Sequence, residues 1–273
     1  MTVPNIELNN GVSIPQLGFG VFQVPPEDTK AAVKTALETS YRHIDTARIY
    51  GNEEGVGGAI AESGIARDEL FITTKLWNDD QGYESTFAAF ENSLKRLGLD
   101  YVDLYLIHWP TPANDTFVDT WKAFEKLYAD KRVRAIGVSN FRTEDLQRLI
   151  DLGLTVPAIN QVELHPQLVQ HELREFHAKH EIATEAWSPL AQGKVFTEKV
   201  IIDIAEAHGK SPAQIVIAWH LALGNVVIPK SVTPSRIAEN LDVFGISLSE
   251  DEIAAITALD SGSRTGPDPA EFN

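Results

Sequence analysis

Hydrophobic and polar positions along this chain form a repeating pattern of short apolar runs and longer amphipathic stretches. One apolar run, residues 101–107, is rich in branched and aromatic side chains and stops abruptly at His108-Trp109-Pro110. A short run of this kind is typical of a β-strand that is buried on both faces. We therefore expect a buried strand that ends in a histidine.

The same pattern predicts the other strands and the helices between them. Further strands are expected over residues 17–22, 41–45, 70–75, 133–138, 158–162, 182–187 and 226–228. Helices are expected over residues 25–39, 53–63, 84–97, 115–130, 143–152, 170–180, 197–208, 212–223, 234–244 and 249–259. Eight strands that alternate with helices indicate a parallel sheet, so we predict an α/β fold, a (β/α)8 TIM barrel with extra helices near the C-terminus. A doubly wound open sheet is the alternative.

The two ends of the chain carry further signals. Asn9-Asn10-Gly11 lies between the apolar segments 6–8 and 12–14, which predicts a β-hairpin that caps the bottom of the barrel. The tail, residues 262–273, is rich in Gly, Pro and Asp and is expected to be a loop over the surface. No repeat or low-complexity segment divides the chain, so we expect residues 1–273 to form a single barrel domain.

Composition narrows the possible classes of protein. The chain has 273 residues, of which 43% are hydrophobic, and this is ample for one large core. It has no cysteine, which excludes disulfides, thiol nucleophiles and cysteine-based metal sites. A net charge of -16 argues against nucleic acid and anionic membranes as partners. No signal peptide and no apolar run near the about 20 residues of a membrane span are present, so we expect a soluble cytoplasmic protein.

Polar, titratable or aromatic residues stand where most of the predicted strands end. They are Asp45 with nearby Tyr50, Lys75, His108, Ser139-Asn140, Gln161, Trp187-Ser188 and Lys230-Ser231. Each has a simple structural explanation when taken alone, such as a core histidine or an ion pair between Asp45 and Lys75. In a barrel, however, these strand ends meet at one mouth, where barrel enzymes carry their active sites.

Four of these residues suggest general acid chemistry. A free tyrosine has a pKa of about 10 and is a poor acid near neutrality. The ammonium of Lys75 is expected to lower the pKa of Tyr50, and Asp45 is expected to keep that ammonium charged. His108 can direct a substrate oxygen with a hydrogen bond. The set is suited to protonating a carbonyl oxygen while another group delivers a hydride.

Side chains do not supply hydrides, so such a reaction needs a cofactor. The chain has no Gly-x-Gly-x-x-Gly after a strand, which argues against the usual dinucleotide device. Lys230 and Arg236, around a Ser-Val turn that enters a predicted helix, offer a phosphate site instead. Their position in an otherwise acidic chain favours this interpretation over that of an ordinary solvated helix start.

These residues lie in segments that resemble the aldo-keto reductase family over essentially the whole chain. The segments are HIDTARIYGNEEGVG (43–57), DLYLIHWP (103–110), IGVSNF (136–141), NQVELHP (160–166) and VIPKS (227–231). Within the family, TTKLWND (73–79), PAQ…WHL (212–221) and the short tail most resemble the bacterial 2,5-diketo-D-gluconate reductases. The resemblance implies a monomeric barrel enzyme that binds NADPH before a small carbonyl substrate, without a metal.

The resemblance also implies a role for individual residues. The catalytic tetrad would be Asp45, Tyr50, Lys75 and His108, with Tyr50 as the general acid. Cofactor contacts would come from Ser139, Asn140, Gln161, Trp187, Ser188, Leu190, Gln192, Lys230, Ser231, Val232, Arg236, Glu239 and Asn240. Phe22, Trp77 and Trp109 would wall the substrate pocket.

Two departures from the family pattern accompany this resemblance. Trp187 stands where most members place a tyrosine against the nicotinamide, and Phe22 stands where many mammalian members have a tryptophan. The diketogluconate-reductase group shares the tryptophan, so Trp187 supports that subgroup. The loop 111–119 and the tail are short, which implies an open pocket.

Two other functions remain as alternatives. A cofactor-binding, weakly catalytic redox sensor of the same fold would hold the nucleotide and turn over little. A barrel hydrolase would use Glu163 and Glu185 as paired carboxylates, or a metal held by His165, His171 and His177. The histidine spacing does not match a helical metal motif, and no His-Glu-x-x-His is present.

Overall fold

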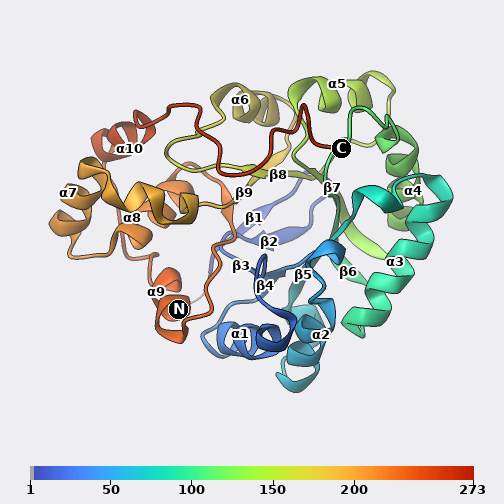
Figure 1. The fold of residues 1–273 in the computed structure, drawn as a ribbon, viewed down its shortest axis with the longest axis horizontal. Helices are drawn as coiled ribbons and strands as arrows, with labels where there is room; N and C mark the ends of the chain where they lie inside the picture. Colours follow the sequence, from blue (N-terminus) through green and yellow to red (C-terminus); the bar gives the residue numbers. More distant parts are fainter. Residues whose placement is uncertain (1–2) are drawn as a thin grey trace.

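The computed structural model describes residues 3–273 and has an eight-stranded parallel sheet at its centre (Figure 1). The strands are β3 (Phe19–Gly20), β4 (His43–Asp45), β5 (Phe71–Leu76), β6 (Val102–Ile107), β7 (Val133–Ser139), β8 (Ile159–Glu163), β9 (Ala183–Trp187) and β10 (Val226–Val227). Each strand pairs in parallel with its neighbour in chain order. A parallel bridge from Leu17 to Val227 joins the first and last strands, so the sheet closes into the predicted (β/α)8 barrel.

Helices surround the strands on the outside of the ring (Figure 1). They are α1 (Pro26–Glu38), α2 (Glu53–Glu62), α3 (Tyr83–Leu97), α4 (Phe117–Ala129), α5 (Thr143–Asp151), α6 (His171–Lys179), α7 (Lys199–His208), α8 (Pro212–Ala222), α9 (Pro234–Leu241) and α10 (Glu250–Thr257). Short 3-10 helices occur at η1 (Arg48–Tyr50), η2 (Arg67–Glu69), η3 (Asn78–Asp80) and η4 (Ala191–Thr197). The extra helices predicted near the C-terminus are confirmed, with two between β9 and β10 and two after β10.

Successive side chains along a strand point alternately into the barrel and outward to the helices. On β6, Leu104 and Leu106 join the cluster at the base of the barrel, whereas Tyr105 and Ile107 pack in the larger cluster with the helices. Space inside the ring is limited, because a Cβ on Gly137 would overlap Leu106 and Ile159. The strands are thus buried on both faces, as their continuous apolar runs predict.

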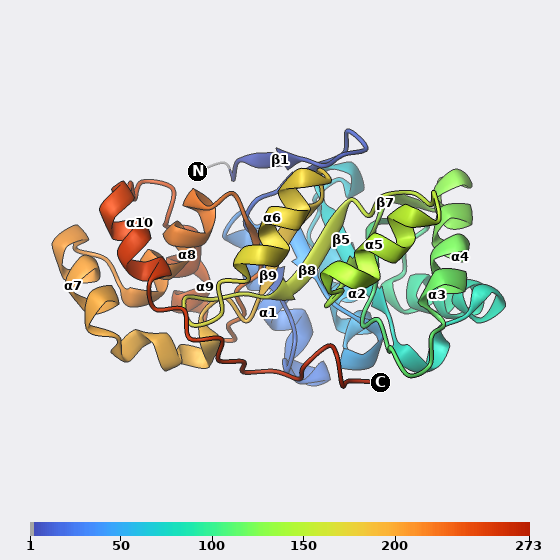
Figure 2. The ribbon, with the colours of Figure 1, turned by 90° about the horizontal axis from the view of Figure 1, so that it is seen from above.

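The N-terminal hairpin closes the bottom of the barrel. Its strands β1 (Asn5–Glu7) and β2 (Ser13–Pro15) pair in antiparallel fashion around the Asn-Asn-Gly turn. Leu8 and Ile14 are buried in one cluster with Phe71 and Val226, which lie near the start of their strands. Figure 2 shows the hairpin on one side of the barrel and the C-terminal tail on the other. The predicted cap is therefore confirmed.

Several predicted boundaries were wrong, each for a local reason. The first barrel strand is only two residues long, and its neighbour Leu17 contributes a single bridge. Helix α4 begins at Phe117 and not at residue 115, because Asp115 has a left-handed φ of 51° and pairs with Arg148. Helix α9 ends at Leu241, where Asp242 leaves the helical region with ψ 61°. The strand centres were predicted better than the element ends, because turns depend on tertiary contacts.

The tail is a loop, as predicted, but it has a defined path. Thr265 and Gly266 donate backbone hydrogen bonds to the buried carboxylate of Glu163. Near the end of the chain, the ring of Phe272 packs 4.5 Å from the ring of Trp109. The tail therefore crosses the carboxyl ends of the strands, opposite the hairpin (Figure 2).

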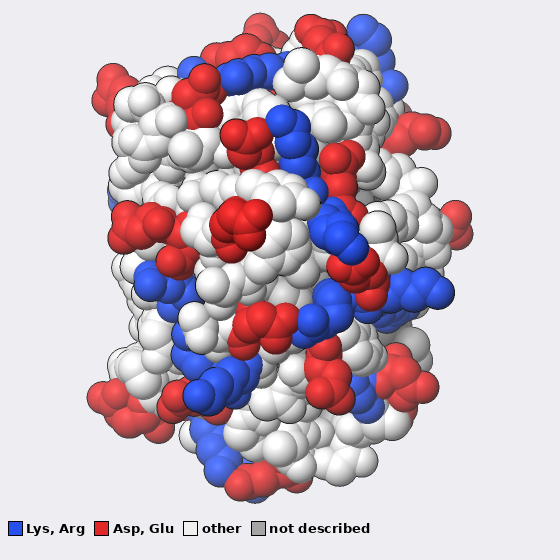
Figure 3. All heavy atoms as spheres, turned by 90° about the vertical axis from the view of Figure 1, so that its right-hand side faces the viewer, with Lys and Arg blue, Asp and Glu red and all other residues white. Residues whose placement is uncertain are grey.

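Charges of both signs share the surface of the molecule. The face formed by α3 and α4 shows Lys and Arg side chains interspersed with Asp and Glu, without a large area of one sign (Figure 3). Ion pairs such as Lys122–Asp119 and Lys126–Asp130 account for part of this mixture. Within residues 3–273, no helix combines the length and the apolar character needed to cross a bilayer.

Candidate active site

The carboxyl ends of the strands surround a cavity of about 1250 Å³. Of the residues predicted from the sequence, it is lined by Phe22, Asp45, Tyr50, Trp77, His108, Trp109, Ser139, Asn140, Gln161, Trp187, Ser188, Leu190, Gln192, Lys230, Ser231, Arg236, Glu239 and Asn240. Two predicted residues do not line it. Lys75 is completely buried behind the wall, and Val232 is 51% exposed outside the cavity. The single mouth predicted from the strand ends is therefore present.

A buried ion pair lies in the floor of this cavity. Asp45 ends β4 and Lys75 lies near the end of the adjacent β5, with both side chains directed inward. Lys75 Nζ is 2.5 Å from Asp45 Oδ1 and donates a second hydrogen bond of 2.9 Å to the carbonyl of Thr46. The neighbouring carboxylate raises the pKa of Lys75 against the opposing effect of burial, so the lysine stays charged.

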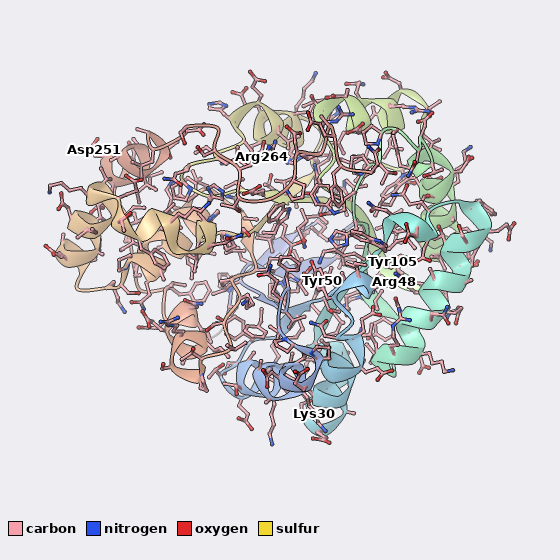
Figure 4. The ribbon with its side chains drawn as sticks, in the orientation of Figure 1. Lys30, Arg48, Tyr50, Tyr105, Asp251 and Arg264 are labelled. Carbon is pink, nitrogen blue, oxygen red and sulfur yellow. The ribbon has the colours of Figure 1, made fainter. Side chains whose placement is uncertain are left out.

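Tyr50 is held above this pair by the segment that follows β4. It ends η1, and Gly51 then takes a left-handed φ of 68°, a conformation that favours glycine. Buried Asn52 fixes the segment, because its amide donates to the carbonyl of Val21 and its oxygen accepts from Thr46. Figure 4 shows Tyr50 over the centre of the barrel, whereas Lys30 lies at the periphery.

The expected acidity of Tyr50 requires a correction. The ammonium of Lys75 is 5.2 Å from the centre of the Tyr50 ring and does lower the pKa of the phenol. Burial raises that pKa by more, and the negative charges of Asp45 and Glu185 act in the same direction. The net pKa of Tyr50 lies above its usual value, so the expectation of an unusually acidic phenol is wrong for the protein without its cofactor. Lys75 makes the rise in the pKa of Tyr50 smaller but does not reverse it.

His108 stands beside Tyr50 as a neutral imidazole. The two rings are 5.7 Å apart in an edge-on arrangement. Burial lowers the pKa of His108 well below its ordinary value, and the charge of Lys75 adds to this effect. Because a neutral imidazole carries one N–H, His108 can donate one hydrogen bond toward the cavity and accept one with its other nitrogen.

Polar side chains at the ends of β7 and β8 form a connected network on the opposite wall. Asn140 has a left-handed φ of 62°, and its amide donates to the carbonyl of His108 and to Ser139 Oγ. The indole N–H of Trp187 donates to Asn140 Oδ1 over 2.8 Å. Gln161 Nε2 donates to Asp45 Oδ2, which ties this wall to the ion pair.

Cations occur at the far end of the cavity. Lys230 and Arg236 are exposed side chains near the N-terminus of α9. Within residues 3–273, neither makes a salt bridge with an acidic side chain. Two unpaired cations beside a helix start offer a place for a phosphate group.

Aromatic side chains form the end of the cavity nearest Tyr50. The rings of Phe22 and Tyr50 are 5.1 Å apart, and those of Trp77 and His108 are 5.2 Å apart. Phe272 from the tail adds a further wall, 6.2 Å from Trp77 and 4.5 Å from Trp109. This end is shaped for a small, partly apolar molecule.

Some residues that line the cavity were not predicted from the sequence. They are Gly20, Gln23, Ile49, Pro189, Gly193, Phe196, Ser211, Pro212, Ala213, Ile228, Pro229, Thr265, Gly266, Pro267 and Phe272. Most lie next to a predicted residue and could have been found by extending each strand end. The tail residues gave no such signal, since their Gly- and Pro-rich composition indicates a loop without showing where it runs.

The residues of the hydrolase alternative have internal partners instead. Glu163 accepts hydrogen bonds from His165 and from the tail. His177 bonds to Asn160 and Thr184, and His171 pairs with Glu175 on the surface. In the part of the chain that the structure describes, no group of three or more potential ligands could hold a metal ion.

Comparison with known proteins gives consistent matches. The model of the aldo/keto reductase family matches residues 16–261. An aldo-keto reductase of Mycolicibacterium smegmatis is 59% identical over 270 residues, which are 99% of this chain and 98% of that protein. Methylglyoxal reductase DkgA of Escherichia coli is 54% identical over 269 residues, which are 98% of this chain and 97% of that protein.

Solved structures show the same similarity. The crystal structure of an aldo/keto reductase from Brucella melitensis matches with a TM-score of 0.93 and 60% identity, covering 95% of this chain and 99% of that one. A variant of Gox0644 in complex with NADPH matches with a TM-score of 0.96 and 49% identity, covering 100% of both chains.

Proposed function

The chain belongs to the aldo/keto reductase family, and from this premise we propose that it reduces aldehyde and ketone carbonyls to alcohols with NADPH. The observation that carries the proposal is the Asp45–Lys75 ion pair below Tyr50, in the wall of a cavity that has free cations at its other end. One end of the cavity fits the protonation of an oxygen, and the other end fits a phosphate.

The residues present fit NADPH along the length of the cavity. Lys230 and Arg236 would hold its additional phosphate, and Trp187 would pack against the nicotinamide. Ser139, Asn140 and Gln161 offer hydrogen-bonding groups at the depth of Asp45, where the carboxamide would bind. When bound, NADPH supplies the hydride that no side chain can provide. That the Gox0644 variant was solved with NADPH supports this choice of cofactor.

The side chains near Tyr50 would perform the proton chemistry. His108 and Tyr50 both face the aromatic end, so a carbonyl oxygen there can accept hydrogen bonds from both. Tyr50 then donates its phenolic proton to that oxygen, and the ammonium of Lys75 stabilises the phenolate that remains. Asp45 keeps Lys75 charged and fixed in place throughout.

The substrate class follows from the aromatic walls and from the relatives. We propose small aldehydes and α-dicarbonyls as substrates, because several relatives are named methylglyoxal reductases. Keto-sugar acids such as 2,5-diketo-D-gluconate remain within the proposal through the resemblance to that subgroup. The cations that line the cavity, Lys230 and Arg236, lie at its cofactor end, and the ammonium of Lys75 near Tyr50 is buried and paired with Asp45, so the cavity lining offers an acidic substrate no unpaired cation at that end.

We also propose that residues 1–273 act as a single barrel domain and as a monomer in the cytoplasm. Acidic and basic side chains are interspersed across the face over α3 and α4, and such a charged face supports the monomer. Size-exclusion chromatography with light scattering tests this, and a dimer mass would contradict it.

A steady-state assay tests the proposed reaction. The purified protein should consume NADPH, followed by its absorbance, with methylglyoxal and with an aromatic aldehyde, and turnover of a keto-sugar acid should be slower. NADPH binding, followed by fluorescence, should accompany this turnover. Binding without turnover of any carbonyl would favour the redox sensor, and absence of binding would contradict both functions.

A further inference from the structure

A second buried carboxyl lies close to the ion pair and has no role in the proton transfer described above. Glu185 is on β9 at the same level as Gln161 on β8 and is completely buried. Gln161 Nε2 donates hydrogen bonds both to Asp45 Oδ2, over 2.8 Å, and to Glu185 Oε2, over 2.9 Å. One amide nitrogen therefore bridges the two carboxyl groups.

This bridge determines how the amide of Gln161 is turned. Both N–H bonds of its amide point to carboxyl oxygens, and its side chain also lines the cavity. The amide oxygen of Gln161 thus remains as an acceptor for a donor in the cavity, such as a carboxamide N–H. Without Glu185, one N–H would lose its buried partner and the amide would be less firmly oriented.

The other oxygen of Glu185 faces a histidine. Glu185 Oε1 has no hydrogen-bond partner and lies 3.7 Å from His43 Nε2. His43 is completely buried, and Gly18 leaves the space for its ring because a Cβ there would overlap it. Burial lowers the pKa of His43 to about 3, so the imidazole is neutral and places no positive charge beside Glu185; its Nε2 is hydrogen-bonded to Thr73 Oγ1.

The charges around Glu185 favour its protonated form. The titratable groups that face it are Asp45 and His43 on β4, Lys75 on β5 and Tyr50 on η1. Burial first, and then the charge of Asp45, raise the pKa of Glu185 to about 8, against weaker effects of Gln161 and Lys75. The ionised form would act in turn on the site, since its charge raises the pKa of both Tyr50 and Lys75.

We propose that Glu185 is a positioning residue for carbonyl reduction: its protonated carboxyl holds Gln161 against Asp45 with the amide oxygen turned to the cofactor, and its ionisation weakens Tyr50 as an acid. The proposal rests on the proposed function for its effect on turnover. Its structural part, a buried carboxyl that keeps its proton, stands on the complete burial of Glu185 and on the second carboxyl, Asp45, which shares the amide nitrogen of Gln161 with it.

The pH dependence of turnover tests the functional part. In the wild type, kcat for methylglyoxal should fall several-fold as the pH rises through about 8, where Glu185 loses its proton. Glu185→Gln replaces the protonated acid by an amide of nearly the same shape that cannot ionise, so its profile, normalised to its own maximum, should fall at a higher pH. Glu172→Gln, which changes an exposed glutamate on α6 outside the cavity, should keep the wild-type pH dependence. If kcat of Glu185→Gln fell at the same pH as in the wild type, the proposal would be overturned and the fall would be assigned to Tyr50.

The pH dependence of stability tests the structural part without any turnover. A carboxyl whose pKa rises on folding, here from 4.5 to about 8, loses its stabilising proton as the pH increases through that window. Urea unfolding should therefore show Glu185→Gln gaining stability relative to the wild type from pH 4.5 to 8 and remaining level above it. A constant difference would show that Glu185 is ionised and overturn the proposal. If Glu185→Gln gains stability in this way but the wild type turns over no carbonyl, the result supports the buried proton and contradicts only the proposed function.

Discussion

Lys75 is the only lysine in residues 3–273 whose side chain is fully buried. Its ammonium is surrounded by one carboxylate, one backbone carbonyl and one phenol ring. A buried charge is retained only with such compensation, because burial alone would favour loss of the proton. The arrangement places a fixed positive charge next to the phenol that we propose as the proton donor.

Replacement of Lys75 should therefore affect both activity and stability. Lys75→Met removes the ammonium, leaves Asp45 buried without its partner and should lower the stability by about 3–5 kcal/mol. The rate of carbonyl reduction should fall by about 10²–10⁴-fold, because the phenolate of Tyr50 is no longer stabilised. Urea unfolding and kcat measure the two effects.

Lys30→Met provides the matched control for this variant. Lys30 pairs with Glu62 on the surface, far from the mouth of the barrel (Figure 4). Surface pairs of this kind contribute little, so this variant should remain close to the wild type in both assays. Equal losses in the two variants would contradict a special role for Lys75.

The proximity of Tyr50 to Lys75 could be predicted from the sequence, but the electrostatic balance at the phenol could not. A lysine near a tyrosine lowers its pKa, and the sequence shows that both stand near strand ends. How strongly burial opposes this effect depends on the depth of the phenol, which only the folded chain defines. The same holds for Glu185, which the sequence suggested as one of a carboxylate pair and which the structure places beside Gln161.

At the level of elements, the start of α9 determines the expected cofactor preference. Lys230 and Arg236 should contact the phosphate that distinguishes NADPH from NADH, and each charge-assisted contact is worth about 1.5–3 kcal/mol. Replacing both by alanine should weaken NADPH binding much more than NADH binding, as measured by fluorescence titration of each cofactor. Lys199→Ala on α7, an exposed lysine outside the cavity, is the control. If the double variant still preferred NADPH over NADH to the same degree, the assignment of Lys230 and Arg236 to that phosphate would be wrong.

The tail is the second element that bears on the site. Glu163 is its anchor, since the carboxylate accepts from Thr265 N and Oγ1 and from Gly266 N. Glu163→Ala should release these contacts, speed hydrogen exchange at the two amides and raise KM by loosening Phe272 over the cavity. Glu271→Ala changes an exposed acid of the same tail and should alter neither quantity. Slow exchange in Glu163→Ala would show that the anchor lies elsewhere.

Element types were more predictable than element ends and loop paths. Apolar runs such as residues 102–107 and amphipathic stretches such as residues 84–97 follow the periods of strand and helix. The path of the tail depends on one buried glutamate 102 residues before Thr265, which no local pattern contains.

At the scale of the whole molecule, several histidines are buried in the neutral form. Burial lowers the pKa of His43, His177 and His220 to about 3 each. In the unfolded chain these side chains take up a proton near pH 6.5, so the stability that they contribute is present above that pH and is lost below it. The contribution of Glu185 to stability changes with pH in the opposite direction. The contribution of one histidine therefore has to be measured with a variant of that residue.

His177→Gln isolates one of these contributions. The variant keeps an acceptor for the amide of Asn160 but cannot take up a proton. From pH 7 to pH 5, the wild type should lose up to about 2 kcal/mol more stability than the variant, a value that follows from the histidine pKa in the unfolded chain. Parallel loss in the two proteins, followed by urea unfolding, would mean that His177 is not held neutral.

The barrel as a whole could be predicted because its signals are redundant. Eight strands repeat one pattern, and their ends carry the residues that meet at the mouth, so an error at one boundary does not change the fold. The closing contact, by contrast, is a single bridge between Leu17 and Val227, which is too short to give a pattern of its own.

A proton from Tyr50 is the central claim of this account, and single-turnover kinetics test it most directly. The NADPH-bound protein is mixed with excess methylglyoxal, and the loss of NADPH absorbance is followed for the wild type and for Tyr50→Phe. The variant should react about 10²–10⁴-fold more slowly, while its affinity for NADPH, measured by fluorescence, stays at the wild-type value. A variant that binds NADPH normally and reacts at the wild-type rate would contradict the claim.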